Sequence, residues 1–131
     1  ATLPGDIGLL AQWMDGFTAW GRFRNGVYSV DVTFLSNYVL LTRAFDEHRV
    51  TARYDHFEMS EADRTPLDEN SERGHAWTLS YQYTPTPKIS IATEWLQIFT
   101  ERPAWAYFDL EQRKTETQFQ LLLRLQFGHS F

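Results

Sequence analysis

Residues 118–131, QFQLLLRLQFGHSF, carry an apolar side chain at nearly every second position. Read with a period of two, one face of this segment holds Phe119, Leu121, Leu123, Leu125, Phe127, His129 and Phe131. The other face holds Gln118, Gln120, Leu122, Arg124 and Gln126. Because side chains alternate across a strand, the pattern predicts a β-strand with one apolar and one polar face. That apolar face must pack on a soluble core or meet lipid.

Composition narrows the class of protein. The 131 residues are enough for one domain. Aromatic residues make up 16% of them, and so many large rings must either be buried or face a membrane. The net charge of -5 argues against a nucleic-acid partner, and the lack of cysteine excludes disulfides and thiolate metal sites. No stretch approaches the roughly 18 apolar residues of a transmembrane helix, so membrane insertion would have to use strands.

Five further segments alternate in the same way and predict an all-β, antiparallel protein of about six strands. They are residues 7–21, 27–44, 49–59, 75–84 and 88–100. The Asp15-Gly16 pair leaves open a short hairpin within the first of them. In the second, we expect Val30, Phe34 and Tyr38 on the apolar face and Asp31 on the polar one.

The connections alternate in length. FDEHR (45–49) and TPTPK (84–88) are short and rich in turn-forming residues, whereas 61–74 and 101–114 are each about fourteen residues long, well beyond most hairpin loops. Up-and-down barrels of the bacterial outer membrane have this asymmetry, with short periplasmic turns and long extracellular loops. The connections therefore favour a transmembrane β-barrel.

Several stretches resemble a known family. The alternation back from Phe131 resembles the C-terminal signature that the assembly machinery of bacterial outer-membrane barrels recognises. HRVTARYDHFEM (48–59), GHAWTLSYQYTPTPKISIATEWLQIFTERPA (74–104) and TETQFQLLLRLQF (115–127) resemble the final strands of proteobacterial porin-like proteins. The resemblance covers about the last two thirds of the chain. It implies an outer-membrane location, contact with lipopolysaccharide and the assembly machinery, and no cofactor.

Six strands are too few to close a barrel in lipid, because the outer two would expose unpaired backbone groups to hydrocarbon. We therefore expect residues 1–131 to be the C-terminal part of a larger barrel, with strands from an upstream segment or from other subunits completing it. The start at ATLPGD, without Met or signal peptide, favours a processed or truncated product.

The polar faces supply candidates for a water-filled lumen. Charges of both signs along such a wall would create a transverse field, although the same residues could also pair and only stabilise the wall. The candidate lumen-lining residues are Asp31, Arg49, Arg53, Asp55, Glu94 and Arg124.

Aromatic residues on the apolar faces are candidates for the girdles of a membrane barrel, where amphipathic rings favour the headgroup level. Ordinary packing in a soluble barrel is the alternative. The candidate girdle residues are Trp13, Trp20, Trp77, Tyr81, Tyr83, Trp95, Phe127 and Phe131.

Signals for other chemistry are weak. The acidic loop 61–74 lacks the ligand spacing of an EF-hand, so no metal is expected there. Asp55 and His56 are adjacent on a strand and should face opposite sides, which prevents a catalytic relay. The sequence thus predicts a non-enzymatic, porin-like channel for passive solute diffusion. A soluble barrel that binds lipid or a small ligand, and a structural barrel subunit completed by a partner chain, are the alternatives.

Overall fold

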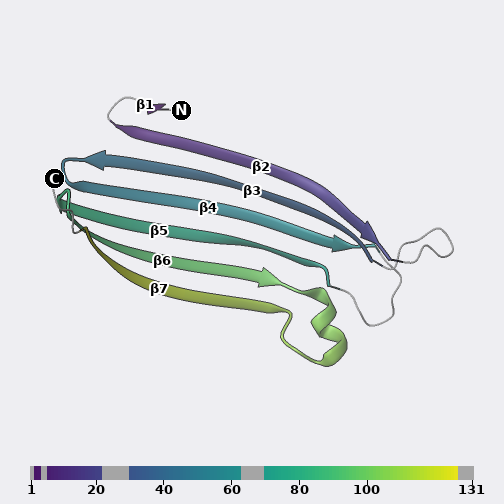
Figure 1. Cartoon of the computed structure of the whole chain (residues 1–131). Coiled ribbons are helices and arrows are strands. Elements are labelled where there is room, and N and C mark those ends of the chain that lie inside the picture. The colour runs from purple at the N-terminus through teal and green to yellow at the C-terminus, as the bar shows by residue number, and fades with distance from the viewer. Residues whose placement is uncertain (1, 4–5, 22–29, 63–69, 127–131) are drawn as a thin grey trace.

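The computed structural model describes residues 2–3, 6–21, 30–62 and 70–126 of the chain. They form one antiparallel sheet whose strand order follows the sequence, as Figure 1 shows. The strands are β1 (Thr2–Leu3), β2 (Ile7–Trp20), β3 (Val30–Phe45), β4 (His48–Glu61), β5 (Glu72–Thr86), β6 (Ile89–Glu101) and β7 (Arg113–Leu125). The all-β, antiparallel, up-and-down prediction with six long strands is confirmed.

The two short turns lie where the sequence predicted them. Only two residues separate β3 from β4, and Asp46 takes a left-handed conformation there with φ of 50°. Asp tolerates that conformation better than most residues because its short side chain hydrogen-bonds locally. Pro87 and Lys88 connect β5 to β6. β2 runs without a break through Asp15 and Gly16, so the alternative hairpin does not form.

One element was not predicted. The connection between β6 and β7 contains a 3₁₀ helix, η1 (Pro103–Phe108), which begins with proline and ends before Asp109, whose φ is 57°. Proline suits a helix start because its missing N–H would have no intrahelical partner there. Within the described residues no helix is long and apolar enough to cross a membrane.

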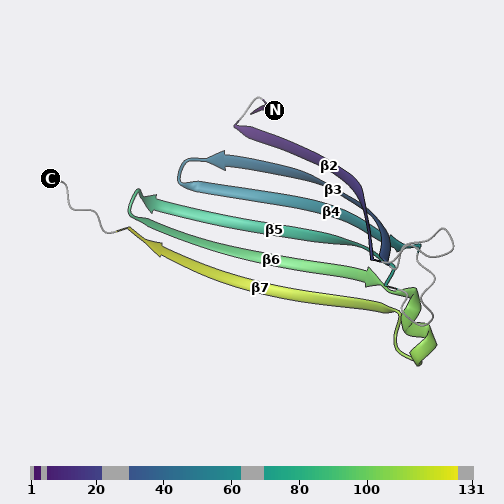
Figure 2. The same cartoon turned by 45° about the vertical axis from the view of Figure 1, so that its right-hand side comes forward.

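The sheet is open. In the part of the chain that the structure describes, β7 pairs only with β6, and β2 pairs with β3 and with the two-residue β1. The two outer strands, β2 and β7, lie at opposite margins of the sheet in both views (Figures 1 and 2). An open sheet of this kind is compatible with part of a barrel.

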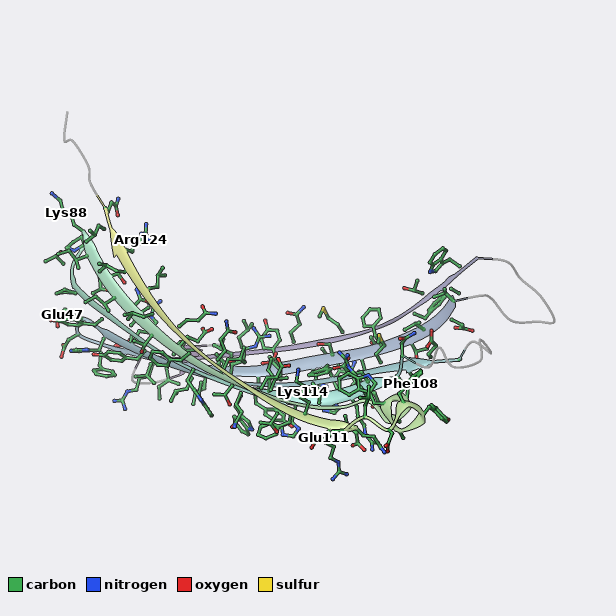
Figure 3. All side chains as sticks on the ribbon, turned by 90° about the horizontal axis from the view of Figure 1, so that it is seen from below. Glu47, Lys88, Phe108, Glu111, Lys114 and Arg124 are labelled. Atoms are coloured by element: carbon green, nitrogen blue, oxygen red, sulfur yellow. The ribbon has the colours of Figure 1, made fainter. Side chains whose placement is uncertain are left out.

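The sheet is bent into a trough. Figure 3 shows it edge-on, with its two ends curving toward the same side. On a bent sheet, side chains spread apart on the convex face and crowd together on the concave face. In β5 the apolar Trp77 and Leu79 are 48% and 49% exposed, whereas Thr78 and Ser80 on the other face are half-buried. In β5 the large apolar side chains therefore occupy the convex face and the polar ones the concave face.

A conventional hydrophobic core is missing from the described part of the chain. Its buried hydrophobic residues are Ala76 in β5 and Ala104 in η1, both small. Soluble domains bury their large apolar side chains, which supply most of the favourable free energy of folding. Here many large apolar side chains are exposed, most of them on the convex face and some, such as Trp20 and Phe34, on the concave one. The continuous hydrogen-bonded ladder from β2 to β7 connects the strands.

Aromatic rings lie over glycines on the concave face. A Cβ added at Gly74 would meet the Phe57 ring at 2.6 Å as well as the backbone oxygen of Phe99. A Cβ at Gly16 would meet the Phe34 ring at 2.7 Å. The missing side chain leaves room for a ring from the neighbouring strand, which pins the register of the pair.

The register corrects the predicted faces of β3. Leu40 pairs with Arg53, and Tyr38 pairs with Asp55, so both lie on the concave face with the charged residues of β4. Asp31, an odd number of residues away from both, lies on the convex face. The predicted assignment was wrong because β3 carries large apolar residues on both faces, and only pairing with β4 distinguishes the two.

Candidate functional site

The concave face is hollowed near its long-loop end. A cavity of about 530 Å³ lies over β4, β5, β6 and β7, and η1 contributes Trp105 to its wall. Its floor is apolar and includes Ala76, Leu96 and Ile98. Ala76 of β5 pairs with Ile98 of β6, and Leu96 is the next residue of β6 on the same face. Charged side chains from β4, β5, β7 and the η1 connection surround this floor.

Arg53 and Asp55 form the central charged pair. They are two residues apart on β4 and so share a face, where Nε of Arg53 donates to both carboxylate oxygens at 2.9 Å and its Nη2 donates to Oδ1. The guanidinium also stands 4.1 Å from the centre of the Tyr38 ring. A guanidinium held by a carboxylate on one side and a ring on another has few free rotamers. The pair therefore presents a fixed dipole to the cavity.

A second ion pair holds η1 against the sheet. Nη2 of Arg102 lies 2.7 Å from a carboxylate oxygen of Glu72, and the guanidinium stands 5.1 Å from the Trp105 ring. Ala104, next to Trp105, is only 6% exposed. These contacts place the Trp105 side chain over the end of the concave face, where it lines the cavity.

Lys114 and Glu116 make the third ion pair, on the concave face of β7. The cavity thus has three cations and three anions among its lining residues, and their formal charges sum to zero. The cations are Arg53, Arg102 and Lys114, and the anions are Asp55, Glu72 and Glu116.

Five of the six predicted lumen residues share the concave face: Arg49, Arg53, Asp55, Glu94 and Arg124. Of these, the cavity brings together Arg53 and Asp55. Asp31 does not share their face, so its predicted grouping with them is wrong.

Four charged residues of the cavity were missed: Glu72, Arg102, Lys114 and Glu116. For the last two a signal was present, because Lys114 and Glu116 extend the polar face of 118–126 two steps upstream with unchanged period. Glu72 stands at the end of one long connection and Arg102 at the start of the other. No periodicity indicates the direction of a side chain there.

The convex face holds the predicted girdle residues Trp13, Trp77, Tyr81, Tyr83 and Trp95. Trp20 lies on the opposite, concave face, because seven residues separate it from Trp13 on an uninterrupted strand. Phe127 and Phe131 lie outside the described residues.

Rings on the convex face gather in two rows. Near the short turns, His48 stacks with Phe45 and Tyr83 at centroid distances of 5.4 and 4.9 Å and hydrogen-bonds the Tyr81 hydroxyl at 2.8 Å. Nearer the long loops, Tyr54 packs on Trp77 at 4.7 Å. There His75 also stacks on Phe99, at 4.8 Å.

Most large side chains between the two aromatic rows are aliphatic; among them are Leu41, Val50, Ala52, Leu79, Ile91, Leu121 and Leu123. Trp95 and Phe119 also lie there, because Trp95 pairs with Leu79 and Phe119 pairs with Trp95. Tyr83 and His75, which mark the two rows on β5, are eight residues apart. That is roughly 26 Å along a strand, or about 20 Å of height at the usual tilt of about 40°. Outer-membrane barrels have an apolar band of about 25 Å between aromatic girdles, about 5 Å more than the height on β5.

Other kinds of site find little support in this part of the chain. Among the described residues, no three histidine or acidic side chains come together as metal ligands do. Asp55 lies on the concave face and His56 on the convex one, as strand alternation predicts, so they form no relay. Residues 63–69 of the acidic loop and His129 lie outside the described residues.

Comparisons with family models, with curated proteins and with solved structures found no match to this chain. A functional assignment therefore rests on the geometry of the two faces.

Proposed function

We propose that this chain forms part of the wall of a porin-like outer-membrane β-barrel that lets small solutes diffuse passively. The observation that carries the proposal is the inversion of the usual burial pattern: Trp77 and Leu79 are about half exposed on the convex face, while the alternating polar residues Thr78 and Ser80 are half-buried on the concave face. A convex apolar surface between two aromatic rows suits lipid, and a charged concave surface suits a water-filled lumen.

The proposed lumen wall has balanced charge around its cavity. Three cations face three anions, so this part of the wall attracts neither sign of solute over the other. Trp105, held by the Arg102 to Glu72 ion pair, narrows the space over the concave face at the loop end. Selectivity here would come from size and from local dipoles rather than from net charge.

The soluble lipid-binding barrel is less well supported. In such a barrel the apolar faces line an inner cavity and the polar faces meet water. That arrangement needs the apolar side chains on the concave face, whereas Leu79 and Trp77 lie on the convex one. The open edges at β2 and β7 favour a role in a larger barrel, either with further strands of the same protein or with a partner chain.

Paired cysteine substitutions at adjacent positions test the proposal. The chain has no cysteine of its own, so Leu79→Cys and Ser80→Cys each introduce a single thiol on opposite faces of β5. In protein reconstituted into a planar bilayer, a charged, water-soluble thiol reagent should label Ser80→Cys and lower the conductance. Leu79→Cys should react only with a membrane-soluble reagent.

Equal reaction of both thiols with the water-soluble reagent would show that the convex face is not in lipid. An absence of conductance, together with the expected labelling difference, would favour a structural barrel subunit over a pore.

A further inference from the structure

Two exposed arginines lie on the convex face just beyond the aromatic row of the long-loop end. Arg73 on β5 and Arg113 on β7 flank Glu101 on β6, and the three occupy one row across the sheet. Nη2 of Arg73 lies 3.0 Å and Nη2 of Arg113 lies 3.8 Å from carboxylate oxygens of Glu101. One carboxylate thus serves two guanidinium groups, and among these three residues the cations outnumber the anion by one.

The exposure of the three side chains differs. Arg73 is 60% and Arg113 81% exposed, whereas Glu101 is only 24% exposed. Both guanidinium groups therefore retain N–H donors that point away from Glu101 and are open to a ligand. Glu58 pairs with Arg73 on the other side, so the charges alternate across the row and the four formal charges sum to zero. The cation at the β7 end, Arg113, is the more exposed of the two arginines that Glu101 joins.

A hollow of about 360 Å³ lies beside these arginines, and its walls change character along the strands. Arg73 and Arg113, with the Glu101 carboxylate between them, line the end toward the loops, and the stacked His75 and Phe99 rings line the end toward the aliphatic band. A ligand that carries an anionic group next to an apolar part can therefore place that group on the exposed arginine donors and the apolar part on the rings.

We propose that this hollow holds the phosphate of an anionic lipid headgroup, with the lipid chains extending over the aromatic row onto the apolar band. Guanidinium groups bind phosphate oxygens in a bidentate fashion, and a row one step outside a girdle lies at headgroup depth. The proposal rests on the proposed function, because it requires the convex face to meet lipid.

The site is tested by measuring how strongly spin-labelled lipids associate with the protein. The full protein is purified from cells and reconstituted into phosphatidylcholine vesicles. We expect phosphatidylglycerol to be preferred over phosphatidylcholine by about fivefold, the size expected for one cationic side chain near an anionic surface. Arg73→Gln together with Arg113→Gln should remove most of this preference. Arg73→Lys with Arg113→Lys should keep part of it, because the charge remains while the planar fork is lost.

The matched control is Arg49→Gln with Arg124→Gln, which removes the same charge from the concave face. The control should keep the full preference, and added inorganic phosphate should not compete. Three outcomes would overturn the lipid site and leave the proposed barrel wall standing. The lipid preference could survive the loss of Arg73 and Arg113, it could also disappear in the control, or inorganic phosphate could abolish it. Failure to insert even into phosphatidylcholine would overturn the proposed function, and the lipid site with it.

Discussion

Replacing Leu79 with arginine should destabilise the protein in a bilayer far more than replacing its neighbour Ser80. Leu79 lies on the convex face, four residues from Tyr83 toward the short turns and four from His75 toward the long loops. Each of those distances is roughly 13 Å along the strand, or about 10 Å of height at a tilt of about 40°. Leu79 is therefore near the middle of the apolar band.

An arginine on the lipid face of a barrel costs about 2–4 kcal/mol at the bilayer midplane and little near the interfaces. For Leu79→Arg we expect about 3 kcal/mol, which lowers the folding equilibrium constant roughly a hundredfold. For Ser80→Arg on the concave face we expect a change within about 0.5 kcal/mol, the range of ordinary surface substitutions.

The assay is equilibrium unfolding by urea in phospholipid vesicles, with both variants compared with the parent protein. A lower midpoint at unchanged slope measures the loss of stability. If the convex face met water, Leu79→Arg would be nearly neutral, because the side chain is already 49% exposed. Equal midpoints for the two variants would therefore refute the assignment of the faces.

Three further outcomes are expected. Phe131→Asp should lower the amount of folded protein in the outer membrane more than it lowers stability in vesicles, measured by fractionation and by urea unfolding; unchanged membrane levels would count against recognition by the assembly machinery. Gly74→Ala should cost about 1–3 kcal/mol in the same unfolding assay, because the new methyl group meets both the Phe57 ring and a backbone oxygen; a neutral result would mean that β5 can shift there. Asp55→Asn should free the Arg53 charge and move the reversal potential of the pore under a salt gradient toward anion selectivity, and no movement would place the pair away from the conduction path.

The sequence by itself determined most of the strands. Alternation predicted the closing strand as residues 118–131 and the structure has β7 as Arg113–Leu125, while the short turns at Asp46 and Pro87 lie where turn-forming residues indicated. Local chemistry suffices for such features, because alternation and turn preferences depend on neighbours in the chain. The η1 helix escaped prediction, since its six residues are too few for any periodic signal.

Tertiary structure alone decided which residues meet. β3 is apolar on both faces, so only its register with β4 places Tyr38 with Asp55 and sends Asp31 to the other side. The charged cavity gathers Arg53, Glu72 and Lys114 from three strands that are far apart in sequence. A period of two assigns each residue to one of two faces, but it cannot say which face is concave or which residue of a neighbouring strand lies opposite. Those relations arise from hydrogen bonding between strands and from the bend of the whole sheet.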